Sequence, residues 1–332
     1  MNGRWIERTE IPADKARYGS FAVLAEEAER AVHELILEAQ QAQPGTEARK
    51  VGDLYASFMN TEAIEAAGIA PLAPWFERVA AVRSIPEFLG QLGAFERAGI
   101  GGFAALFVDN DPGDPNRYVV FVEQAGIGLP DESYFREEGF AEIREAYRTH
   151  IERMFTLAGL DQASERAQRV YALESEIAAV HWDNVASRDS QKTYNLRDWA
   201  AVGELINAQR SEPLDLALWR DAMGVPGHAL AEMVVRQPSF VSGVGALLTE
   251  DRLAAWRDWL AWEVIRGMAS YLNDEIVQAN FDFTGAPSLA PRSSAIAGSA
   301  PSRWSSVAWV RRSASSMSNA TSVRKPNWPW TS

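Results

Sequence analysis

Apolar residues recur at three- and four-residue steps through most of the chain from residue 21 to residue 283, and this spacing constrains the fold more than any other feature. In the first such run Phe21, Leu24 and Ala28 fall on one side of a helix that Ser20 can cap, with Glu27 and Arg30 on the other. Short segments with Gly or Pro separate the runs, so a mainly helical lobe is expected. The helices are predicted at 21–42, 51–58, 61–67, 72–83, 85–98, 137–158, 162–182, 197–208, 214–223, 228–235 and 250–272.

One β-hairpin near residues 103–123 interrupts the helical pattern. The runs FAALFVD and RYVVFVE are rich in β-branched and aromatic residues, and the polar segment NDPGDPN joins them. Its aspartates resemble part of a calcium loop, but Val120 stands where an EF-hand needs a bidentate glutamate. We therefore expect a solvated turn rather than a calcium site.

Composition limits the function classes for this chain of 332 residues. Its net charge is −13, and the absence of a basic patch before residue 284 argues against a nucleic-acid partner. It has no cysteine, so disulfides and thiolate metal sites are excluded. No apolar run approaches the roughly 18 residues of a membrane span, and Met1 is not followed by a signal-peptide core. A cytoplasmic location is expected for the chain as written, while export of a longer parent stays open.

Catalytic motifs are incomplete. A zinc peptidase of the HExxH type needs two histidines one helical turn apart with a glutamate between them, and here Leu37 follows His33 and Glu34 where the second histidine is required. His150, His181 and His228 have no histidine four residues on and are expected to serve in packing or at the surface. No G-x-S-x-G nucleophile elbow is present.

Eight sequence blocks, in order, resemble the amino-terminal part of the neprilysin and endothelin-converting-enzyme family of zinc metallopeptidases. The resemblance covers nearly all of residues 1–283, and the lack of cysteines and of a membrane anchor is similar to the family's soluble bacterial branch. It implies the helical amino-terminal lobe of a two-lobed peptidase that uses zinc to cleave small peptides in a central cavity. The blocks are NGRW at Asn2, IPADKARYGSF at Ile11, VGDLYASFMNTEAIEAAG at Val51, GIGLPDESYF at Gly126, LESEIAAVHW at Leu173, RDSQKTYNL at Arg188, VVRQPSF at Val234 and ANFDF at Ala279.

Arg17 is the candidate substrate-binding residue. It stands just before the expected amino-terminus of the first helix, where backbone N–H groups favour an anion, although a plain surface arginine fits the residues equally. The resemblance implies that Arg17 grips the carboxylate end of a bound peptide. The family's acidic residue in the next turn is Ala22 here, so the polarity of the site departs from the family pattern.

The chain changes character after Phe283. Residues 284–332 hold 13 serines, six Lys or Arg and no acidic residue, whereas residues 1–283 have a net charge of −19. If one nucleotide is restored after the Phe283 codon, codons compatible with the tail read in the next frame as FYGRPLAGTQELRDRW and then GEAVGQLYVERHF, which resemble the family's continuation. We therefore expect a peptidase domain at 1–283 and, from a frameshift, an aberrant Ser-, Arg- and Trp-rich disordered tail at 284–332.

Two functions follow from this interpretation. In the first, the chain is an amino-terminal fragment of a zinc metalloendopeptidase, binds no zinc itself and is inactive alone. In the alternative, it is a retained helical module that binds peptides or a separately encoded catalytic half. The family's lead-in before NGRW is missing here, so either a start codon inside a longer frame or loss of the lead-in is also expected. Without the partner lobe, the Trp-rich helix and the surface around Arg17 are expected to expose apolar area.

Overall fold

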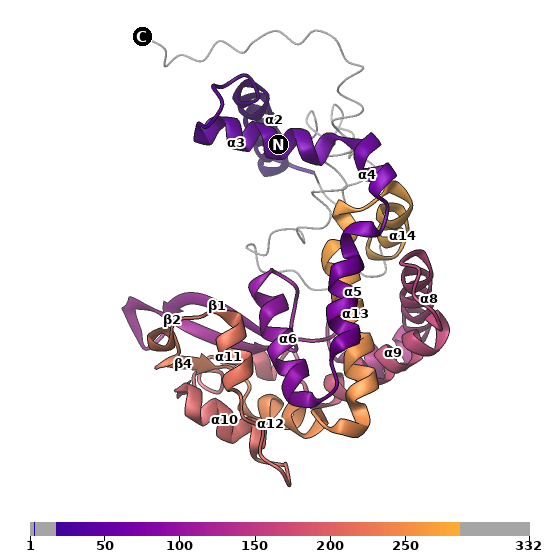
Figure 1. Ribbon diagram of the computed structural model, residues 1–332. Coiled ribbons are helices and arrows are strands. Elements are labelled where there is room, and N and C mark those ends of the chain that lie inside the picture. The colour runs from indigo at the N-terminus through magenta and orange to yellow at the C-terminus, as the bar shows by residue number, and fades with distance from the viewer. Residues whose placement is uncertain (1–2, 4–17, 286–332) are drawn as a thin grey trace. The chain divides into compact units, whose positions relative to one another are not determined.

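The computed structural model describes residue 3 and residues 18–285, and the chain divides between Ile64 and Glu65 into a smaller and a larger compact unit (Figure 1). The division falls inside the short helix α4 (Thr61–Ala67). Most of the described residues are helical, and the strands form one small sheet, so the predicted fold class is confirmed. Among the described residues, no helix combines the length and hydropathy needed to cross a bilayer.

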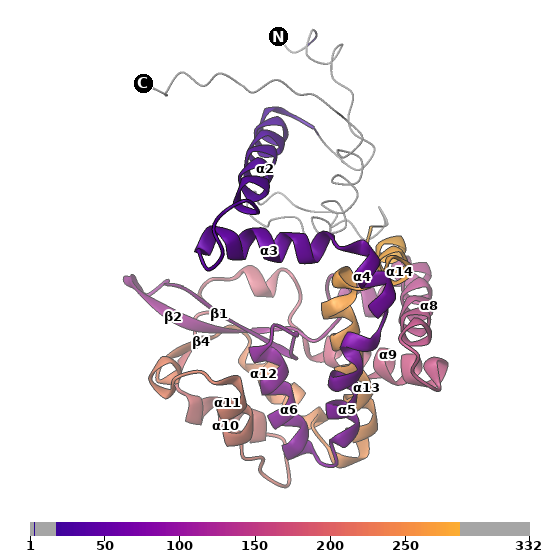
Figure 2. The same cartoon turned by 45° about the horizontal axis from the view of Figure 1, so that its top comes forward.

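The smaller unit contains a pair of crossing helices, α2 (Ser20–Ala39) and α3 (Glu47–Met59) (Figure 2). The helices approach closely because residue 52 is glycine: a Cβ there would lie 2.6 Å from the backbone of Gln40. Near the middle of the pair the Tyr55 hydroxyl lies 2.8 Å from His33 Nε2. None of the residues of α2 is buried, so this pair encloses little apolar core.

The larger unit holds the remaining helices, and most lie close to their predicted bounds. Three of them, α7, α12 and α14, were not predicted. The α-helices are α5 (Ala73–Ala81), α6 (Ile85–Arg97), α7 (Ser133–Arg136), α8 (Ala141–Leu157), α9 (Ala163–Val180), α10 (Trp199–Asn207), α11 (Ala217–Met223), α12 (Pro238–Leu247), α13 (Leu253–Met268) and α14 (Asp274–Thr284). Short 3₁₀ turns are η1 (Ala70–Leu72), η2 (Glu138–Phe140), η3 (Ala186–Arg188), η4 (Gly227–Leu230), η5 (Glu250–Arg252) and η6 (Ala269–Tyr271).

Helix α13 forms the centre of the larger unit. It packs against α5, α6, α8 and α9, and Figure 1 shows it between the sheet and the α8–α9 pair. Trp256, Trp259 and Trp262 are at most 1% exposed. These indoles are packed in the core, as their spacing indicates, and the expectation that the helix would expose apolar area is wrong, because residues of its own unit cover it.

The sheet has four strands in the order β1-β2-β4-β3. Strands β1 (Ala104–Asp111) and β2 (Asp114–Gln124) form the predicted hairpin. Strand β4 (Met233–Val235) then pairs parallel to β2 and antiparallel to β3 (Leu196–Arg197). The helix predicted at 228–235 is wrong: the segment forms η4 and then β4. All three residues of β4 are buried, and a short apolar run does not distinguish a strand from a helix by periodicity.

The hairpin turn is less solvated than predicted. Asp111 is 1% exposed, accepts a hydrogen bond from Gly113 N at 2.8 Å and pairs with Arg117 at 2.7 Å. Gly113 leaves room for Tyr194, because a Cβ at that position would lie 2.1 Å from the tyrosine hydroxyl. The turn is thus anchored by an ion pair and by a residue of the RDSQKTYNL block.

Candidate functional site

The entrance of α2 is the part of the predicted site that the structure describes. Arg17 lies outside the described residues, and Tyr18 follows it with its hydroxyl donating to Glu26 Oε2 at 2.7 Å. Gly19 occupies the N-cap position, so Ser20 is not the cap that was expected. The first turn contains no acidic residue. The positive end of the helix dipole therefore favours an anion at this entrance.

The histidines serve in packing or lie at the surface. His33 shares a hydrogen bond with Tyr55, His181 Nε2 lies 3.0 Å from the carbonyl oxygen of Ala125, and His228 is exposed. His150 stacks on Phe283 with 4.6 Å between ring centroids. Burial, assisted by the nearby Arg153, lowers the pKa of His150 to about 4, so its ring is neutral at neutral pH.

The described residues do not fit a zinc ion. Within residue 3 and residues 18–285, no group of three or more His, Asp or Glu side chains is placed to hold a metal. In the incomplete motif, Leu37 occupies the position of the second histidine and is 43% exposed, and His33 interacts with Tyr55. The donor set of a peptidase zinc site is therefore not assembled by these residues.

Hydrogen bonds centred on a buried glutamate hold the GIGLP loop that precedes α7. Glu174, which is fully buried in α9, accepts hydrogen bonds from Gly128 N at 3.0 Å and from the Tyr147 hydroxyl at 2.8 Å. Trp262 Nε1 in turn donates to the Tyr147 oxygen at 3.1 Å. Two further contacts hold the loop backbone: Trp259 Nε1 donates to the carbonyl of Gly126 and Arg266 to that of Ile127, both at 3.2 Å. Two of the recognised blocks, GIGLPDESYF and LESEIAAVHW, thus meet at one point.

Glu174 holds its proton near neutral pH. Burial raises its pKa to about 7, and the neighbouring carboxylate of Glu263 acts in the same direction, while Arg266 opposes both. Because Glu174 is fully buried, a peptide cannot reach its carboxyl group. The network therefore supports the fold and is not suited to general acid–base catalysis on a bound substrate.

A second buried carboxyl group lies beside the segment that joins α6 to β1. Burial raises the pKa of Glu96 to about 8, although Trp219 Nε1 donates to its Oε2 at 2.6 Å. The segment passes close to two acids because it is built from glycines: a Cβ on Gly102 would lie 1.9 Å from Glu96, and one on Gly101 would lie 3.1 Å from Glu263. One oxygen of each glutamate has no hydrogen-bond partner among the described residues.

A further recognised block, VVRQPSF, meets LESEIAAVHW beside the end of β2. Gln124 accepts a hydrogen bond from Trp182 N at 2.7 Å and donates to the Trp182 carbonyl at 2.9 Å. Trp182 Nε1 then donates to Ser239 Oγ at 2.6 Å, and Gln237 Oε1 accepts from Gln124 N at 3.1 Å. The blocks LESEIAAVHW and VVRQPSF are therefore hydrogen-bonded to the end of β2, the strand that leads into GIGLPDESYF.

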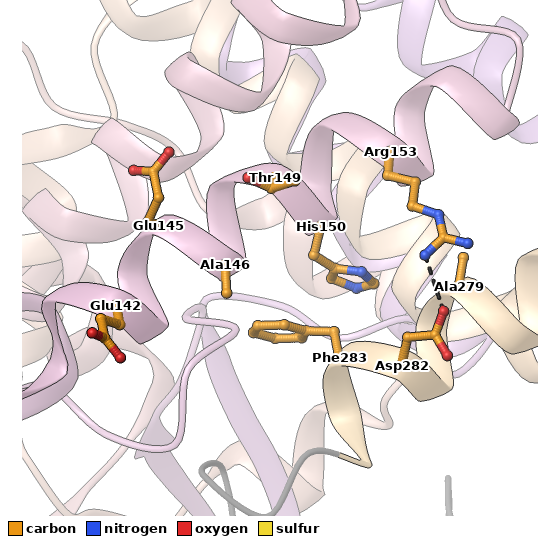
Figure 3. A pocket seen from close by; sticks show the side chains of 9 residues that line it. All are labelled: Glu142, Glu145, Ala146, Thr149, His150, Arg153, Ala279, Asp282 and Phe283. Carbon is orange, nitrogen blue, oxygen red and sulfur yellow. Dashed lines mark hydrogen bonds and ion pairs between the residues drawn. The ribbon is translucent and has the colours of Figure 1, made fainter.

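A shallow pocket of about 460 Å³ lies between α8 and α14 (Figure 3). The His150–Phe283 stack forms its apolar part, and the ion pair between Arg153 and Asp282, 3.0 Å apart, lies at one end. The only titratable ring in it is neutral and stacked, and the aspartate is already paired. The pocket can receive an apolar side chain, but its residues do not form a nucleophile–base pair.

The buried acids Glu96, Glu174 and Glu263 were not among the residues predicted from the sequence. Their signal is present, because Glu174 stands four residues after Val170 and three before Ile177 on the buried side of α9. Likewise Glu263 follows Trp262 and stands four residues after Trp259 on the buried part of α13. A glutamate within an apolar stripe indicates a buried partner, yet that partner comes from another element and cannot be named from spacing.

Comparison with known proteins gives one consistent result. Residues 1–324 match the family model described as peptidase family M13. Endothelin-converting enzyme-like 1 of Rattus norvegicus is 25% identical over 299 residues, which is 83% of this chain and 37% of the relative. Neprilysin of Homo sapiens is 23% identical over 305 residues, with 82% of this chain and 40% of the relative covered.

The solved structures extend the likeness to the fold. The zinc metalloprotease Zmp1 of Mycobacterium tuberculosis, in complex with an inhibitor, is 37% identical and gives a TM-score of 0.79 over 94% of this chain and 46% of Zmp1. The same protease in its open state gives a TM-score of 0.77. PepO of Lactobacillus rhamnosis, at 17% identity and a TM-score of 0.74, shares the fold. The chain thus spans less than half the length of these relatives.

Proposed function

The chain belongs to peptidase family M13, and we propose that it is the amino-terminal part of a zinc metalloendopeptidase that cleaves small peptides. The observation that carries this proposal is the family match over residues 1–324, supported by the likeness of 94% of the chain to Zmp1. The chain spans 46% of Zmp1. We place the zinc, with its HExxH helix and downstream acidic ligand, in a catalytic half beyond this chain, because the described residues do not fit a metal.

The chain alone is then inactive. In a test, the purified full chain is incubated with a fluorogenic peptide of a few residues, with and without added zinc, and then with a chelator. We expect no zinc-dependent hydrolysis. Hydrolysis that a chelator abolishes and zinc restores would overturn this part of the proposal.

Arg17 supplies substrate contact in the assembled enzyme. A guanidinium group forms two parallel hydrogen bonds with a carboxylate, and the entrance of α2 adds its dipole to the attraction. Substitution Arg17→Ala in an active assembly should raise KM for peptides with a free carboxyl end at least tenfold and leave KM for amidated peptides unchanged. An equal effect on both peptides would argue against this role.

The sequence blocks that resemble the family end at Phe283, whereas the family model extends over residues 1–324. We propose that a shift after the Phe283 codon replaced the family's continuation by the Ser-, Arg- and Trp-rich sequence of residues 284–332. Resequencing of the locus tests this directly, because an uninterrupted frame in several isolates is incompatible with a shift. The domain bounds 1–283 and 284–332 depend on the same result, and the cytoplasmic location stays a prediction of the sequence.

The second candidate, a retained binding module, is favoured by the completeness of the larger unit's core. The central tryptophans are buried, and Glu174 and Asp258 have hydrogen-bond partners within that unit. A unit with a closed core can persist after loss of a neighbouring lobe. Such a module would act by binding peptides or by binding a catalytic half encoded separately, and a downstream reading frame that begins with the HExxH half would support the latter.

A further inference from the structure

Helix α2 carries an apolar stripe that lies exposed among the described residues of the smaller unit. Phe21, Leu24, Val32 and Leu35 are between 53% and 87% exposed. At 3.6 residues per turn they fall within one side of the helix, together with Ala28. His33, which contacts Tyr55 of α3, lies on a different side. The stripe is therefore an additional apolar face and not the contact between α2 and α3.

The stripe has the spacing of a docking helix. Phe21, Leu24, Ala28 and Leu35 stand at i, i+3, i+7 and i+14, the pattern by which an amphipathic helix inserts into an apolar groove. The distance from Phe21 to Leu35 is about 21 Å at 1.5 Å per residue. A contiguous exposed apolar face of this kind on a protein marks an interaction surface.

Charge and position indicate what covers the stripe. Helix α2 contains five glutamates and one arginine, so the complementary surface has an apolar centre and basic groups at its edges. The helix begins three residues after Arg17. In the proposed function, Arg17 holds the end of a small peptide whose scissile bond lies at the zinc. A peptide of four residues spans roughly 13 Å when extended, so the beginning of α2 must face the zinc-bearing half.

We propose that the stripe formed by Phe21, Leu24, Val32 and Leu35 is the surface on which this chain binds the zinc-bearing half of an M13 peptidase. The inference rests on the proposed function for the identity of the occupant. It adds which helix face makes the contact and the chemistry of the surface that fits it.

Co-expression tests the proposal. The tagged full chain is produced together with the part of M. tuberculosis Zmp1 that lies outside the matched region, and the partner recovered on the tag is measured. We expect recovery with the wild-type chain and a loss of at least tenfold with Leu24→Gln/Leu35→Gln. The matched control Arg30→Gln/Leu37→Gln introduces the same residue at two exposed positions of α2 outside the stripe and should retain the partner. Equal recovery with both variants, or none with the wild-type chain, overturns the proposal.

Two measurements on the chain alone exclude other occupants. If the stripe is free in the isolated chain, Leu24→Gln/Leu35→Gln leaves the melting temperature unchanged; a fall of several degrees would mean that the chain covers its own stripe. A dimer that forms with rising concentration and is lost in this variant would mean that a second copy is the occupant. Either result overturns the proposal.

The role of Arg17 can be separated from the docking surface. Arg17→Ala should leave recovery of the zinc-bearing half unchanged, because the residue contacts the peptide and not the partner. If peptide hydrolysis does not depend on Arg17 while recovery still depends on the stripe, the substrate-binding proposal fails and the docking proposal stands.

Discussion

Glu174 is fully buried, and opposing contacts set its charge. Burial raises its pKa to about 7 from the ordinary glutamate value of 4.5. The proton is thus held more tightly in the folded chain, and the stability it contributes is fully present below pH 4.5 and is lost as the pH rises to about 7. This shift corresponds to on the order of 3 kcal/mol. Glu96, with a pKa raised to about 8 by burial, acts in the same direction.

We therefore expect the melting temperature of the chain to fall between pH 5 and pH 8. Glu174→Gln, which is neutral throughout, should show a smaller fall when both proteins are followed by circular dichroism over this range. Glu142→Gln changes an exposed glutamate and should reproduce the wild-type curve. Parallel curves for wild type and Glu174→Gln would show that Glu174 does not titrate in this window.

A substitution at Gly128 tests the same hydrogen-bond network around Glu174, because a side chain there would collide with Tyr147. A Cβ at this position would lie 1.9 Å from the Tyr147 hydroxyl and 2.7 Å from its ring carbon Cζ. Gly128→Ala should displace the tyrosine from Glu174 and lower the free energy of unfolding by about 2–4 kcal/mol, measured by urea denaturation. Gly203→Ala in α10, where a Cβ meets nothing within 4 Å, is the matched control and should be neutral or slightly stabilising.

At the residue scale, the sequence predicts which residues are buried better than it predicts which residues they contact. Trp256 and Trp259 could be assigned to packing from their spacing, and both are buried. Asp111 was expected to be solvated because its neighbours are polar, yet Arg117 and Tyr194 enclose it. The hairpin brings Arg117 back to Asp111, and Tyr194 comes from a segment distant in sequence, so neither contact follows from the local pattern.

At the scale of secondary-structure elements, a buried ion pair joins helices α9 and α13. Asp258 is 3% exposed and accepts hydrogen bonds from Arg166 and from Arg169, the latter at 2.5 Å. Both arginines are partly exposed, so water would hydrate them if the aspartate were removed. The contact between the two helices would then lose its ion pair.

Asp258→Ala should lower the free energy of unfolding by about 1.5–3 kcal/mol, the range for hydrogen bonds to a charged group, because the arginines left behind stay in contact with water. Asp221→Ala removes an aspartate from a surface pair with Arg220 and should cost less than about 1 kcal/mol. Both values come from urea denaturation at pH 7. A cost for Asp258→Ala no larger than that of Asp221→Ala would mean that the two helices are held by apolar contacts alone.

The elements that the sequence predicts well are long and periodic, as α8 and α9 are. The failures are short. Met233–Val235 has the composition of either a buried helix turn or a strand, and its pairing with β2 decides the outcome. Helix α12 was missed because Ser242, Gly243 and Gly245 interrupt its pattern, and these residues are buried where the helix packs closely on its neighbours.

At the scale of the whole molecule, the two units differ in how complete they are. The buried residues of the two apolar core clusters come from the larger unit, beginning with Leu72. In the smaller unit, Gly52 is the one buried residue of α3 and α2 has none. This difference is expected if one unit folds by itself and the other is completed by a partner.

Removal of residues 1–60 should therefore leave a cooperatively folded protein. The remaining chain keeps α4 intact, including Glu65, whose Oε1 accepts from Asp274 N at 2.6 Å. We expect its melting temperature to lie within a few degrees of that of the full chain, measured by differential scanning calorimetry. Removal of residues 274–332 is the contrasting deletion, because it takes away Ile276 and Ala279, which are at most 3% exposed, and the ring of Phe283 that stacks on His150. This second deletion should lower the melting temperature markedly. If instead the first deletion abolished cooperative unfolding, the smaller unit would be part of the folding core.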